Sequence, residues 1–553
     1  MKLAAILAAG AIAAATVQTS DLRTRAEISN YEETSTYADV TRVIDGLVAT
    51  SPLVHAESFG TSEEGRALPL VVISDPKVTT PQAARRLGRP IVLVQANIHA
   101  GEVEGKEAVL MLARRLVSGD LKPLTKQVVF MIAPDYNVDG NEKISTMNRA
   151  AQNGPVSGVG TRENGKGLDL NRDYMKLDSA EARALVGLIN AWDPHVVVDL
   201  HTTNGSYHAY HLTYSPMLNP NADPRLIEFT RSKMLAPIRQ VMLKAHNWRV
   251  YDYGNFSSED GGPATGGSAE RARVDPANPG NVTWRTFDHR PRFGNNYVGL
   301  RNRIAILSEA YSYLDFKGRI DVTLDFVAEI SRNVAANARQ ILALTAQADR
   351  VLAAPSTSKP VELGVDISIS TAADKVDIMV GDVTRVLNPK SGLEMNAMAP
   401  LATPVAMREY LTFTATRSLP MPKGWLIPKN AEPRLSAAID RLRWHGITIQ
   451  EVAAAVQLPV ERFSVSEVAK QPRGFQGRTE ARVRGGYDRA QLSVPVGSLF
   501  IPANQRLARL AFYLLEPESD DGLVAWGLID DTIGAGRTYP IYRLTGAVPL
   551  KFK

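Results

Sequence analysis

Short apolar runs rich in β-branched residues alternate with amphipathic segments along much of the chain. The runs have the length of buried strands, whereas the segments between them place apolar residues three or four positions apart, as helices do. Strands that alternate with helices predict an α/β domain built on a largely parallel, buried sheet. The expected strands are at 91–97, 128–134, 195–200 and 304–307, and the clearest expected helices between them are at 104–119 and 179–192.

Two further patterns frame this domain. A helical pattern at 37–48 is followed by a predicted hairpin, with its turn at 61–65 and its second strand at 68–73. A long amphipathic pattern, typical of a helix, runs from 316 to 353. We therefore expect one α/β domain over residues 20–353.

The pattern changes after residue 353. The run APSTSKP at 354–360 is typical of a linker, and short apolar runs punctuated by glycine and proline follow it. We expect a β-rich C-terminal domain over 361–553, or a pair of small ones, and no motif in it indicates a role. Its expected elements are strands at 494–502 and 507–517 and one helix at 433–444.

The first residues have the features of a secretory signal. Lys2 is followed by the apolar stretch Leu3 to Ala15 and then by small residues at which a signal peptidase could cut. About thirteen apolar residues are too few to span a bilayer, and no later stretch approaches that length. We expect residues 1–19 to be a signal peptide and the protein to be exported, either periplasmic or secreted. An N-terminal core helix or a membrane anchor is the alternative.

The composition of the chain excludes several kinds of partner and site. With 63 basic and 58 acidic residues among 553, the net charge is only +5, which gives no basis for a nucleic-acid partner. The chain has no cysteine, so disulfides, thiolate metal sites and a cysteine nucleophile are excluded. Any metal must therefore be bound by carboxylates and by some of the nine histidines.

Candidate metal ligands follow two of the predicted strands. His99 and Glu102 lie three positions apart in QANIHAGEVEG, just after one strand, and His201 follows another in VVVDLHTTNG. Open α/β sheets bind ligands at the carboxyl ends of their strands, where such side chains can converge. Two imidazoles and one carboxylate with an open fourth position suit a catalytic zinc ion, which polarises a carbonyl and lowers the pKa of its bound water.

Each half of this set has another interpretation. A histidine and a glutamate three residues apart are more often a surface pair on a helix. A histidine directly after a buried strand is often a core residue with its hydrogen bonds satisfied. The strand before His99, the close approach allowed by Gly101 and Gly105, and the occurrence of both segments together favour the metal.

Glu309 follows a third buried strand, in RIAILSEAYSY. A carboxylate there must face a crevice or lose much of its hydration. Facing a zinc-bound water, it could accept a proton and later transfer it to a leaving amine. The alternative is a salt bridge at the strand end with Arg301 or Arg303.

The segment GLDLNRDYMK contains a pair suited to holding a carboxylate. Arg172 offers a bidentate fork of N–H donors and Asn171 a neutral donor. Asp169 could accept the outer N–H of a ligating imidazole. The alternative for this segment is ordinary capping of the helix that follows.

These motifs together resemble those of the zinc carboxypeptidases, of which carboxypeptidase A is the best-known member. The resemblance runs from about Tyr31 to Tyr313, and the order of the motifs is more specific than any one of them. It implies a doubly wound α/β/α fold with a mixed, mostly parallel sheet, one Zn2+ per chain, and hydrolysis of C-terminal peptide bonds. The motifs are G-x-S-x-E-G-R at 60–66, H-x-x-E at 99–102, PDYNVDGNE at 134–142, DLNRD at 169–173, DLHT at 199–202 and the E-A-Y that begins at Glu309.

The resemblance also implies two further roles. One is an arginine that stabilises the oxyanion, for which Arg149 is favoured over Arg162. The other is a mobile tyrosine that closes over the substrate, for which Tyr297 is the best candidate. The remaining implied roles, matched by position, are zinc binding by His99, Glu102 and His201, general base by Glu309, binding of the terminal carboxylate by Asn171 and Arg172, and support of the first histidine by Asp169.

Two departures from the family pattern concern the substrate. Digestive members carry an arginine between the first two ligands, where this chain has Ala100 and Gly101, and the basic segment before Glu309 does not align cleanly. The tail LLEPESDDGLVAWGLID, by contrast, is similar to one seen in large bacterial exported members.

Two other functions fit parts of the pattern. N-acyl amino acid amidohydrolases of the aspartoacylase and desuccinylase type resemble this metal site, and a non-catalytic protein could keep the same fold for binding. The complete set of ligands and general base favours the peptidase. We expect an exported zinc metallocarboxypeptidase acting on peptides or cell-wall peptides that have a free C-terminal carboxylate.

Overall fold

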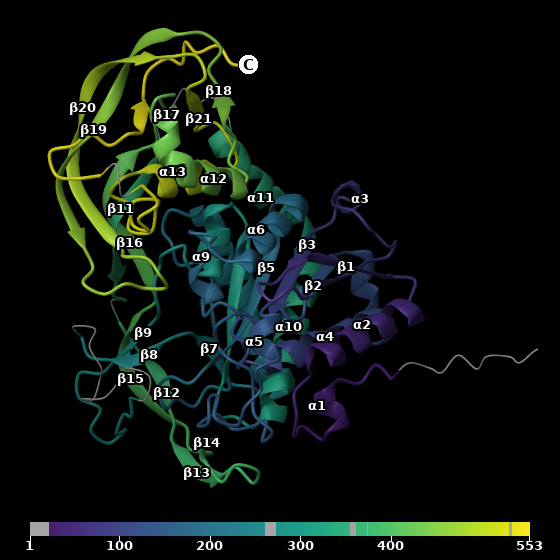
Figure 1. Ribbon diagram of the computed structural model, residues 1–553. Coiled ribbons are helices and arrows are strands. Elements are labelled where there is room, and N and C mark those ends of the chain that lie inside the picture. Colours follow the sequence, from purple (N-terminus) through teal and green to yellow (C-terminus); the bar gives the residue numbers. More distant parts are fainter. Residues whose placement is uncertain (1–20, 260–271, 354–360, 373, 530–532) are drawn as a thin grey trace, which may run out of the picture.

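The structure is a computed structural model, and it describes residues 21–259, 272–353, 361–372, 374–529 and 533–553. The expected signal peptide at 1–19 and the expected linker at 354–360 lie outside the described residues. Figure 1 shows an α/β part with the strands of the C-terminal part arranged along one side and across one end.

An eight-stranded mixed sheet forms the centre of the α/β part, in the spatial order β1-β2-β4-β3-β5-β10-β6-β7. The pairs β4–β3, β3–β5, β5–β10 and β6–β7 are parallel, and the other neighbours are antiparallel. The predicted mixed, mostly parallel sheet is confirmed. The strands are β1 (Val54–Thr61), β2 (Ala67–Ile73), β3 (Ile91–Ala96), β4 (Val129–Ala133), β5 (Val196–Thr203), β6 (Leu212–Ser215), β7 (Val250–Asp252) and β10 (Ile304–Tyr311).

Helices cover the sheet on both faces. The helices α2, α4, α8 and α10 pack against one another on one face, and α6 and α9 contact strands on the other. None of the helices within the described ranges combines the length and hydrophobicity that crossing a bilayer requires. The helices of this part are α1 (Arg25–Ile28), α2 (Tyr37–Thr50), α3 (Pro81–Arg86), α4 (Glu104–Ser118), α5 (Val138–Asn141), α6 (Ala180–Trp192), α7 (Pro224–Phe229), α8 (Ala236–His246), α9 (Gly294–Leu300), α10 (Phe316–Ala336) and α11 (Ala338–Ala353).

The long helix expected at 316–353 is divided into α10 and α11 at Asn337. The side-chain amide of Asn337 donates to the backbone oxygen of Asn333 at 2.9 Å. Asparagine side chains compete in this way with the hydrogen bonds of a continuing helix, which explains a break that the apolar pattern alone does not mark.

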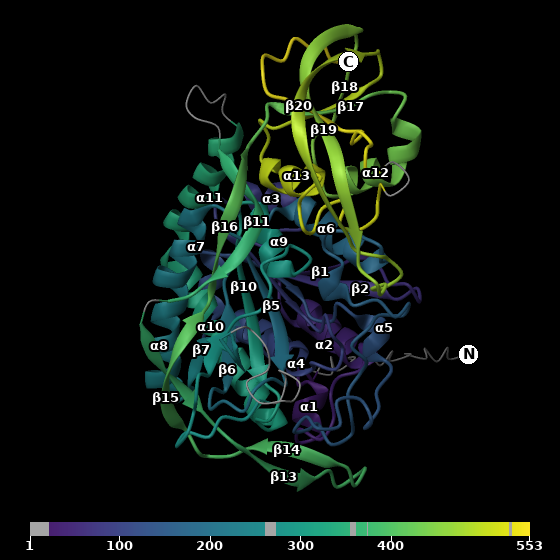
Figure 2. The ribbon, with the colours of Figure 1, turned by 90° about the vertical axis from the view of Figure 1, so that its left-hand side faces the viewer.

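The C-terminal part is rich in strands, as predicted. A six-stranded sheet has the order β18-β21-β17-β22-β19-β20, and its two longest strands form the ribbon that curves along the outside in Figure 2. Two smaller pairs are β11–β16 and the hairpin β13–β14. The bounds are β11 (Glu362–Ser370), β13 (Val383–Leu387), β14 (Glu394–Met398), β16 (Thr412–Pro420), β17 (Gly424–Ile427), β18 (Gln450–Glu451), β19 (Val456–Lys470), β20 (Ala481–Val494), β21 (Leu499–Pro502), β22 (Tyr542–Leu544) and the helix α12 (Ser436–Trp444).

One expected strand of this part is a helix. The segment 507–517 forms α13 (Ala508–Leu515), and every residue of that helix is buried. A helix that is buried all round lacks the apolar stripe that distinguishes helices from strands, so its short apolar run resembles a core strand. The prediction of a strand there is wrong for this reason.

The two parts are joined by a shared sheet and a buried ion pair. The strands β12 (Lys375–Val380) and β15 (Thr403–Tyr410) continue into β9 (Thr283–Arg285) and β8 (Asn255–Ser257), with β15 parallel to β9. Close by, the guanidinium of Arg292 donates to Asp521 at 2.8 Å, and both side chains are buried. The C-terminal part therefore packs as an extension of the α/β part.

Candidate metal centre and catalytic cleft

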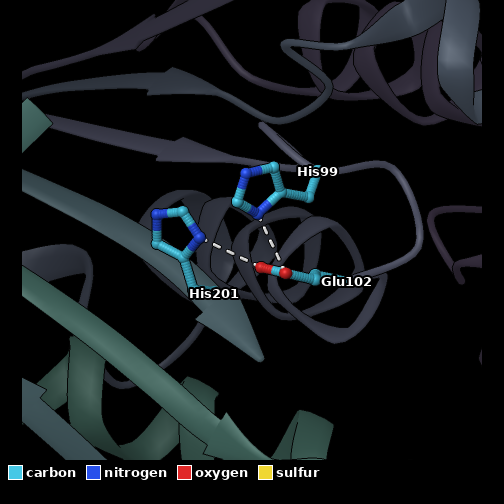
Figure 3. A group of neighbouring side chains, drawn as sticks. All are labelled: His99, Glu102 and His201. Atoms are coloured by element: carbon cyan, nitrogen blue, oxygen red, sulfur yellow. Dashed lines mark hydrogen bonds and ion pairs between the residues drawn. The ribbon is translucent and has the colours of Figure 1, made fainter. Parts of the chain in front are cut away.

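The two histidines and the glutamate predicted to bind metal come together at the carboxyl edge of the central sheet. His99 lies in the turn after β3, Glu102 lies just before α4, and His201 lies in β5, which pairs with β3. In that turn the backbone N–H of Glu102 donates to the backbone oxygen of His99 at 2.9 Å. Figure 3 shows both imidazole rings turned toward the Glu102 carboxylate.

The distances within this group suit a single ion. The Nδ1 atoms of His99 and His201 lie 2.9 and 3.0 Å from the two carboxylate oxygens of Glu102. One ligand atom from each residue can be chosen so that all lie within 4.8 Å of one another, and all these side chains are buried. Their nitrogen and oxygen donors match the ligand set of a catalytic zinc ion.

The outer ring nitrogens face carboxylates. Nε2 of His99 lies 3.0 Å from Oδ1 of Asp169, and Nε2 of His201 lies 3.0 Å from Oδ2 of Asp199. A proton held on each Nε2 leaves the Nδ1 lone pairs pointing at the Glu102 oxygens, which are acceptors as well. Acceptors that face one another at this distance need a proton or a metal ion between them, and the nitrogen and oxygen donors present fit a metal ion.

Glu102 also receives a charged partner from the protein. The guanidinium of Arg149 donates to its Oε1. Although burial raises the pKa of Glu102, the charges of His99 and Arg149 hold it well below its usual range. Gly101 leaves room for this contact, because a Cβ there would lie 2.8 Å from the Cδ of Arg149 and the arginine would have to shift.

Glu309 stands beside the metal ligands in β10. In the parallel pairing of β5 and β10 it is the register partner of His201. Among the described residues, no side chain forms a hydrogen bond or ion pair with its carboxylate. The salt bridge considered as an alternative is not formed, since Arg301 donates to Asn190 and Arg303 donates to Asp193. Burial raises the pKa of Glu309 to about 8.

Asn171 and Arg172 lie in a 3₁₀ turn, η2 (Leu170–Arg172), and both line the cleft. Nδ2 of Asn171 lies 3.4 Å from Nε2 of His201. The guanidinium of Arg172 lies over the ring of Phe293 at 4.1 Å. One N–H of the guanidinium donates to the backbone oxygen of Asn171 at 2.8 Å. No carboxylate among the described residues is at ion-pair distance from Arg172, so its other donors remain available to an anionic ligand.

Asp169 precedes this turn and joins it to the metal centre. Its Oδ1 accepts from the backbone N–H of Asn171 at 2.9 Å, so Asp169 caps the short turn while it faces His99. Its Oδ2 accepts from Arg162 at 2.7 Å. Both candidate arginines therefore reach the cleft, Arg162 through Asp169 and Arg149 through Glu102.

The cleft has a volume of about 260 Å³ and contains all but two of the predicted site residues. Asp169 lies behind its wall. Tyr297 lies elsewhere: it is fully buried in α9, and its hydroxyl hydrogen-bonds with Nδ1 of His445 at 2.9 Å and accepts from Arg301 at 3.1 Å. A tyrosine packed in the core on both sides cannot close over a substrate, so the expectation for Tyr297 is corrected. The lining residues are His99, Glu102, Arg149, Arg162, Asn171, Arg172, His201, Thr202, Thr203, Asn204, Tyr253, Phe287, Asp288, Phe293, Leu307 and Glu309.

Sequence reasoning missed several of these lining residues. Tyr253 is half-buried in the cleft wall one residue after β7, and its ring packs edge-on against Phe287 with centroids 5.4 Å apart. Its place directly after a strand of the central sheet was the available signal. Asp199 was missed as well, although residues two apart on a strand share a face and could have linked it to His201.

Comparison with known proteins agrees with this geometry. Residues 40–278 match the family model described as zinc carboxypeptidase. Carboxypeptidase 2 of Trichophyton equinum is 22% identical over 506 residues, which cover 89% of this chain and 82% of the relative. Carboxypeptidase Z of Mus musculus is 32% identical over 150 residues, which cover 26% of this chain and 22% of the relative.

A solved metallo-carboxypeptidase from Burkholderia cenocepacia covers 54% of this chain and 68% of its own length, at 18% identity and a TM-score of 0.36. Residues 40–278, which match the family model, include His99, Glu102 and His201. Residues 40–278 are thus similar to a zinc carboxypeptidase domain, and relatives named carboxypeptidase are similar along most of the chain.

Proposed function

We propose that this protein is an exported carboxypeptidase that uses one zinc ion to remove residues from the C-terminus of peptides or cell-wall peptides. One observation carries the proposal. A single cleft combines the His99–Glu102–His201 group, the carboxylate of Glu309 and the guanidinium of Arg172, for which the described residues offer no carboxylate partner. Together they offer a metal site, a base and an anion-binding group within reach of one peptide end.

A metal ion would be held by Nδ1 of His99 and of His201 and by the Glu102 carboxylate. When bound, zinc polarises the scissile carbonyl and lowers the pKa of a water molecule. Asp169 and Asp199 keep the protons of His99 and His201 on Nε2 and fix the orientation of the rings. These two aspartates are therefore positioning residues for the metal site.

Glu309 acts as the general base and then as the general acid. Its carboxylate accepts a proton from the attacking water and delivers it to the nitrogen of the leaving residue. Because burial raises the pKa of Glu309, the carboxylate binds a proton more readily than an exposed glutamate does. Its freedom from other partners keeps it available for both transfers.

Asn171 and Arg172 bind the C-terminal carboxylate of the substrate. Arg172 offers paired N–H donors, and its packing on Phe293 limits the positions that the guanidinium can adopt. Arg149 stabilises the oxyanion: once a cation balances the charge of Glu102, the Arg149 guanidinium can donate to the oxygen of the attacked carbonyl.

The test of the proposal is the product pattern of purified, zinc-loaded enzyme. The substrates are a mixed peptide library, the same peptides as C-terminal amides, and a set of N-acyl amino acids, with products identified by mass spectrometry. Release of single residues from the free-acid peptides supports the carboxypeptidase. Cleavage of the N-acyl amino acids alone would favour the amidohydrolase, and no cleavage with zinc bound would favour a binding protein.

Export is a separate part of the proposal and rests on the leader-like residues 1–19. The full chain, expressed in a bacterium with an outer membrane, is expected in the periplasm or the medium with those residues removed. N-terminal sequencing of the recovered protein checks this, and an intact Met1 on cytoplasmic protein would contradict it.

A further inference from the structure

A second hollow adjoins the catalytic cleft. It has a volume of about 330 Å³ and shares Arg149 and Asn204 with the cleft. Among the residues that the structure describes, its other lining positions come from three segments, of which one belongs to the C-terminal part. These are Ala150, Ala151 and Gln152, then Ser312 and Tyr313, and then Leu393 and Glu394.

The hairpin β13–β14 supplies the outer wall of this hollow. Glu394 begins β14, and the hairpin lies at one end of the molecule in both views (Figures 1 and 2). Backbone hydrogen bonds fix it to the catalytic part: Asn396 N–H donates to Ala151 at 3.0 Å, and Met398 N–H donates to Tyr313 at 2.6 Å. The hairpin is thus held against the loop that carries Arg149.

The relative position of the two hollows indicates which part of a substrate meets the second one. With the terminal carboxylate at Arg172 and the scissile carbonyl at the metal ligands, the last residue occupies the side of the cleft near Phe293. The preceding residues must leave on another side. Arg149 and Asn204 lie where the cleft opens into the second hollow, and the exposed amide of Asn204 can hydrogen-bond to a peptide backbone there.

The side chains of this hollow suit a long cationic residue. Ala150, Ala151 and the half-buried Leu393 offer apolar surface, and the carboxylate of Glu394 stands at the rim. Lysine and arginine bury an apolar stem and keep the charged end in water, which is the pattern that such a wall and rim accommodate. The ion pair of Glu394 with Arg385 spans 3.3 Å with side chains 61% and 58% exposed, so a substrate cation can replace it at little cost.

We propose that this hollow binds the part of the peptide upstream of the scissile bond, and that Glu394 favours substrates with lysine or arginine there. The inference rests on the proposed carboxypeptidase function. It gives the C-terminal part a role in substrate selection, because β14 lines the hollow beside the catalytic cleft and belongs to a segment beyond the matched residues 40–278. Glu394 touches neither the reacting atoms nor the metal ligands, so it is a specificity residue.

The test uses the full-length, zinc-loaded protein and six-residue peptides with one C-terminal residue. A single lysine is moved through the upstream positions, and each peptide is paired with a twin in which a glutamine replaces the lysine. The measured quantity is the ratio of kcat/KM for the lysine peptide to that of its twin. For the wild type we expect a ratio of about two to five at one or two positions, as for a partly exposed charge pair.

Variants test whether the Glu394 carboxylate, and not another part of the hollow, causes the preference for lysine. Glu394→Gln should bring the ratio to about one, Glu394→Lys should reverse it, and Arg385→Gln should increase it by releasing Glu394. The matched control is Glu467→Gln on β19, an exposed glutamate that does not line the hollow, and it should keep the wild-type ratio.

Two results would overturn the inference. One is a lysine preference that Glu394→Gln leaves unchanged, and the other is the absence of any upstream preference in a wild type that cleaves all the peptides. A blocked dipeptide with glycine upstream of the scissile bond, which presents no side chain to Glu394, identifies failure at the earlier step. If zinc-loaded wild type does not cleave even the dipeptide, the proposed function fails, and this inference fails with it.

Discussion

Glu309 and His201 are register partners in the parallel pairing of β10 with β5. Partners of this kind project to the same face of a sheet, so the carboxylate and the imidazole meet at one point of the cleft. In the same pairing Leu307 is the register partner of Asp199, two positions earlier along each strand. The sheet register therefore brings a base, a ligand and the aspartate behind that ligand into one site.

Substitution Glu309→Gln tests the role of the base. The amide has the same size but cannot accept a proton at neutral pH, so turnover should fall by about 10² to 10⁴-fold while zinc content and Tm stay near those of the wild type. Metal analysis, thermal unfolding and peptide turnover on one preparation measure all three. Turnover close to that of the wild type with zinc bound would remove Glu309 from the mechanism.

Glu104→Gln is the matched control for this change. Glu104 is also a buried glutamate, but it pairs with Arg319 at 3.2 Å and does not line the cleft. Breaking a buried pair leaves a charge without its partner, so this variant should lose stability, by about 3 kcal/mol or more, and keep its turnover per folded molecule.

The functional side chains that lie at the ends of strands could be predicted from the sequence. His99, His201 and Glu309 each lie in or directly after an apolar run, and the carboxyl ends of parallel strands meet at one edge. For these residues the local sequence was therefore enough to predict both the functional side chain and its position at the edge of the sheet. The β5–β10 pairing that puts Glu309 beside His201 needed the spatial order of the strands, which the sequence does not contain.

Tyr297 illustrates what the sequence could not provide. Its position relative to Glu309 suggested a mobile residue, but its partner is His445, 148 positions further along the chain. Contacts across that distance depend on the packing of the C-terminal part, for which no local pattern existed. The helix α13 was also missed because of its packing. It is buried on all sides, so its sequence lacks the alternation of apolar and polar positions that marks a helix.

Substitution Asp199→Asn tests the support of the metal site. The amide cannot attract the Nε2 proton of His201 as a carboxylate does, and loss of such a partner typically lowers metal affinity about 10 to 100-fold. Competition with a chromophoric chelator measures zinc affinity directly. Asp366→Asn, at a partly exposed aspartate that does not line the cleft, is the control, and an affinity of Asp199→Asn equal to that of the control would contradict the assignment.

Substitution Asp521→Asn tests how firmly the two parts are joined. It leaves the buried guanidinium of Arg292 without its main partner, which should cost about 3–5 kcal/mol of unfolding free energy. Glu480→Gln, at a more exposed partner of the same arginine, should cost less. Denaturant unfolding followed by far-UV circular dichroism and by tryptophan fluorescence should give one shared transition for the wild type, and separate transitions would mean that the parts unfold independently.

Buried His445 predicts a loss of stability in acid. Its Nε2 donates to the backbone oxygen of Met175, Nδ1 accepts from Tyr297, and burial lowers its pKa from 6.5 to about 3. Below pH 6.5 the unfolded chain therefore binds a proton that the folded chain does not, and stability falls as the pH drops from 6.5 towards 3. At about 1.4 kcal/mol per unit of pKa difference, the loss amounts to a few kcal/mol.

His445→Gln should reduce the slope of this pH dependence, since glutamine keeps a donor and an acceptor but does not titrate. Part of the slope should remain, because burial also lowers the pKa values of His195, His208 and His211. Unfolding free energy measured between pH 4 and pH 8 checks the slope. His55→Gln, on the partly exposed strand β1, is the control and should follow the wild type. A slope of His445→Gln equal to that of the wild type would show that another group causes the acid sensitivity.

The most direct test of the central claim compares one peptide with its C-terminal amide, using wild type and Arg172→Ala. Zinc-loaded wild type should release one residue at a time from the free acid and leave the amide largely intact, because the guanidinium–carboxylate pair exists only with the acid. Arg172→Ala should raise KM for the acid and change the amide little. A chelator should stop the reaction and added zinc restore it. Equal cleavage of acid and amide by the wild type, or cleavage that persists without metal, would contradict a zinc-dependent carboxypeptidase.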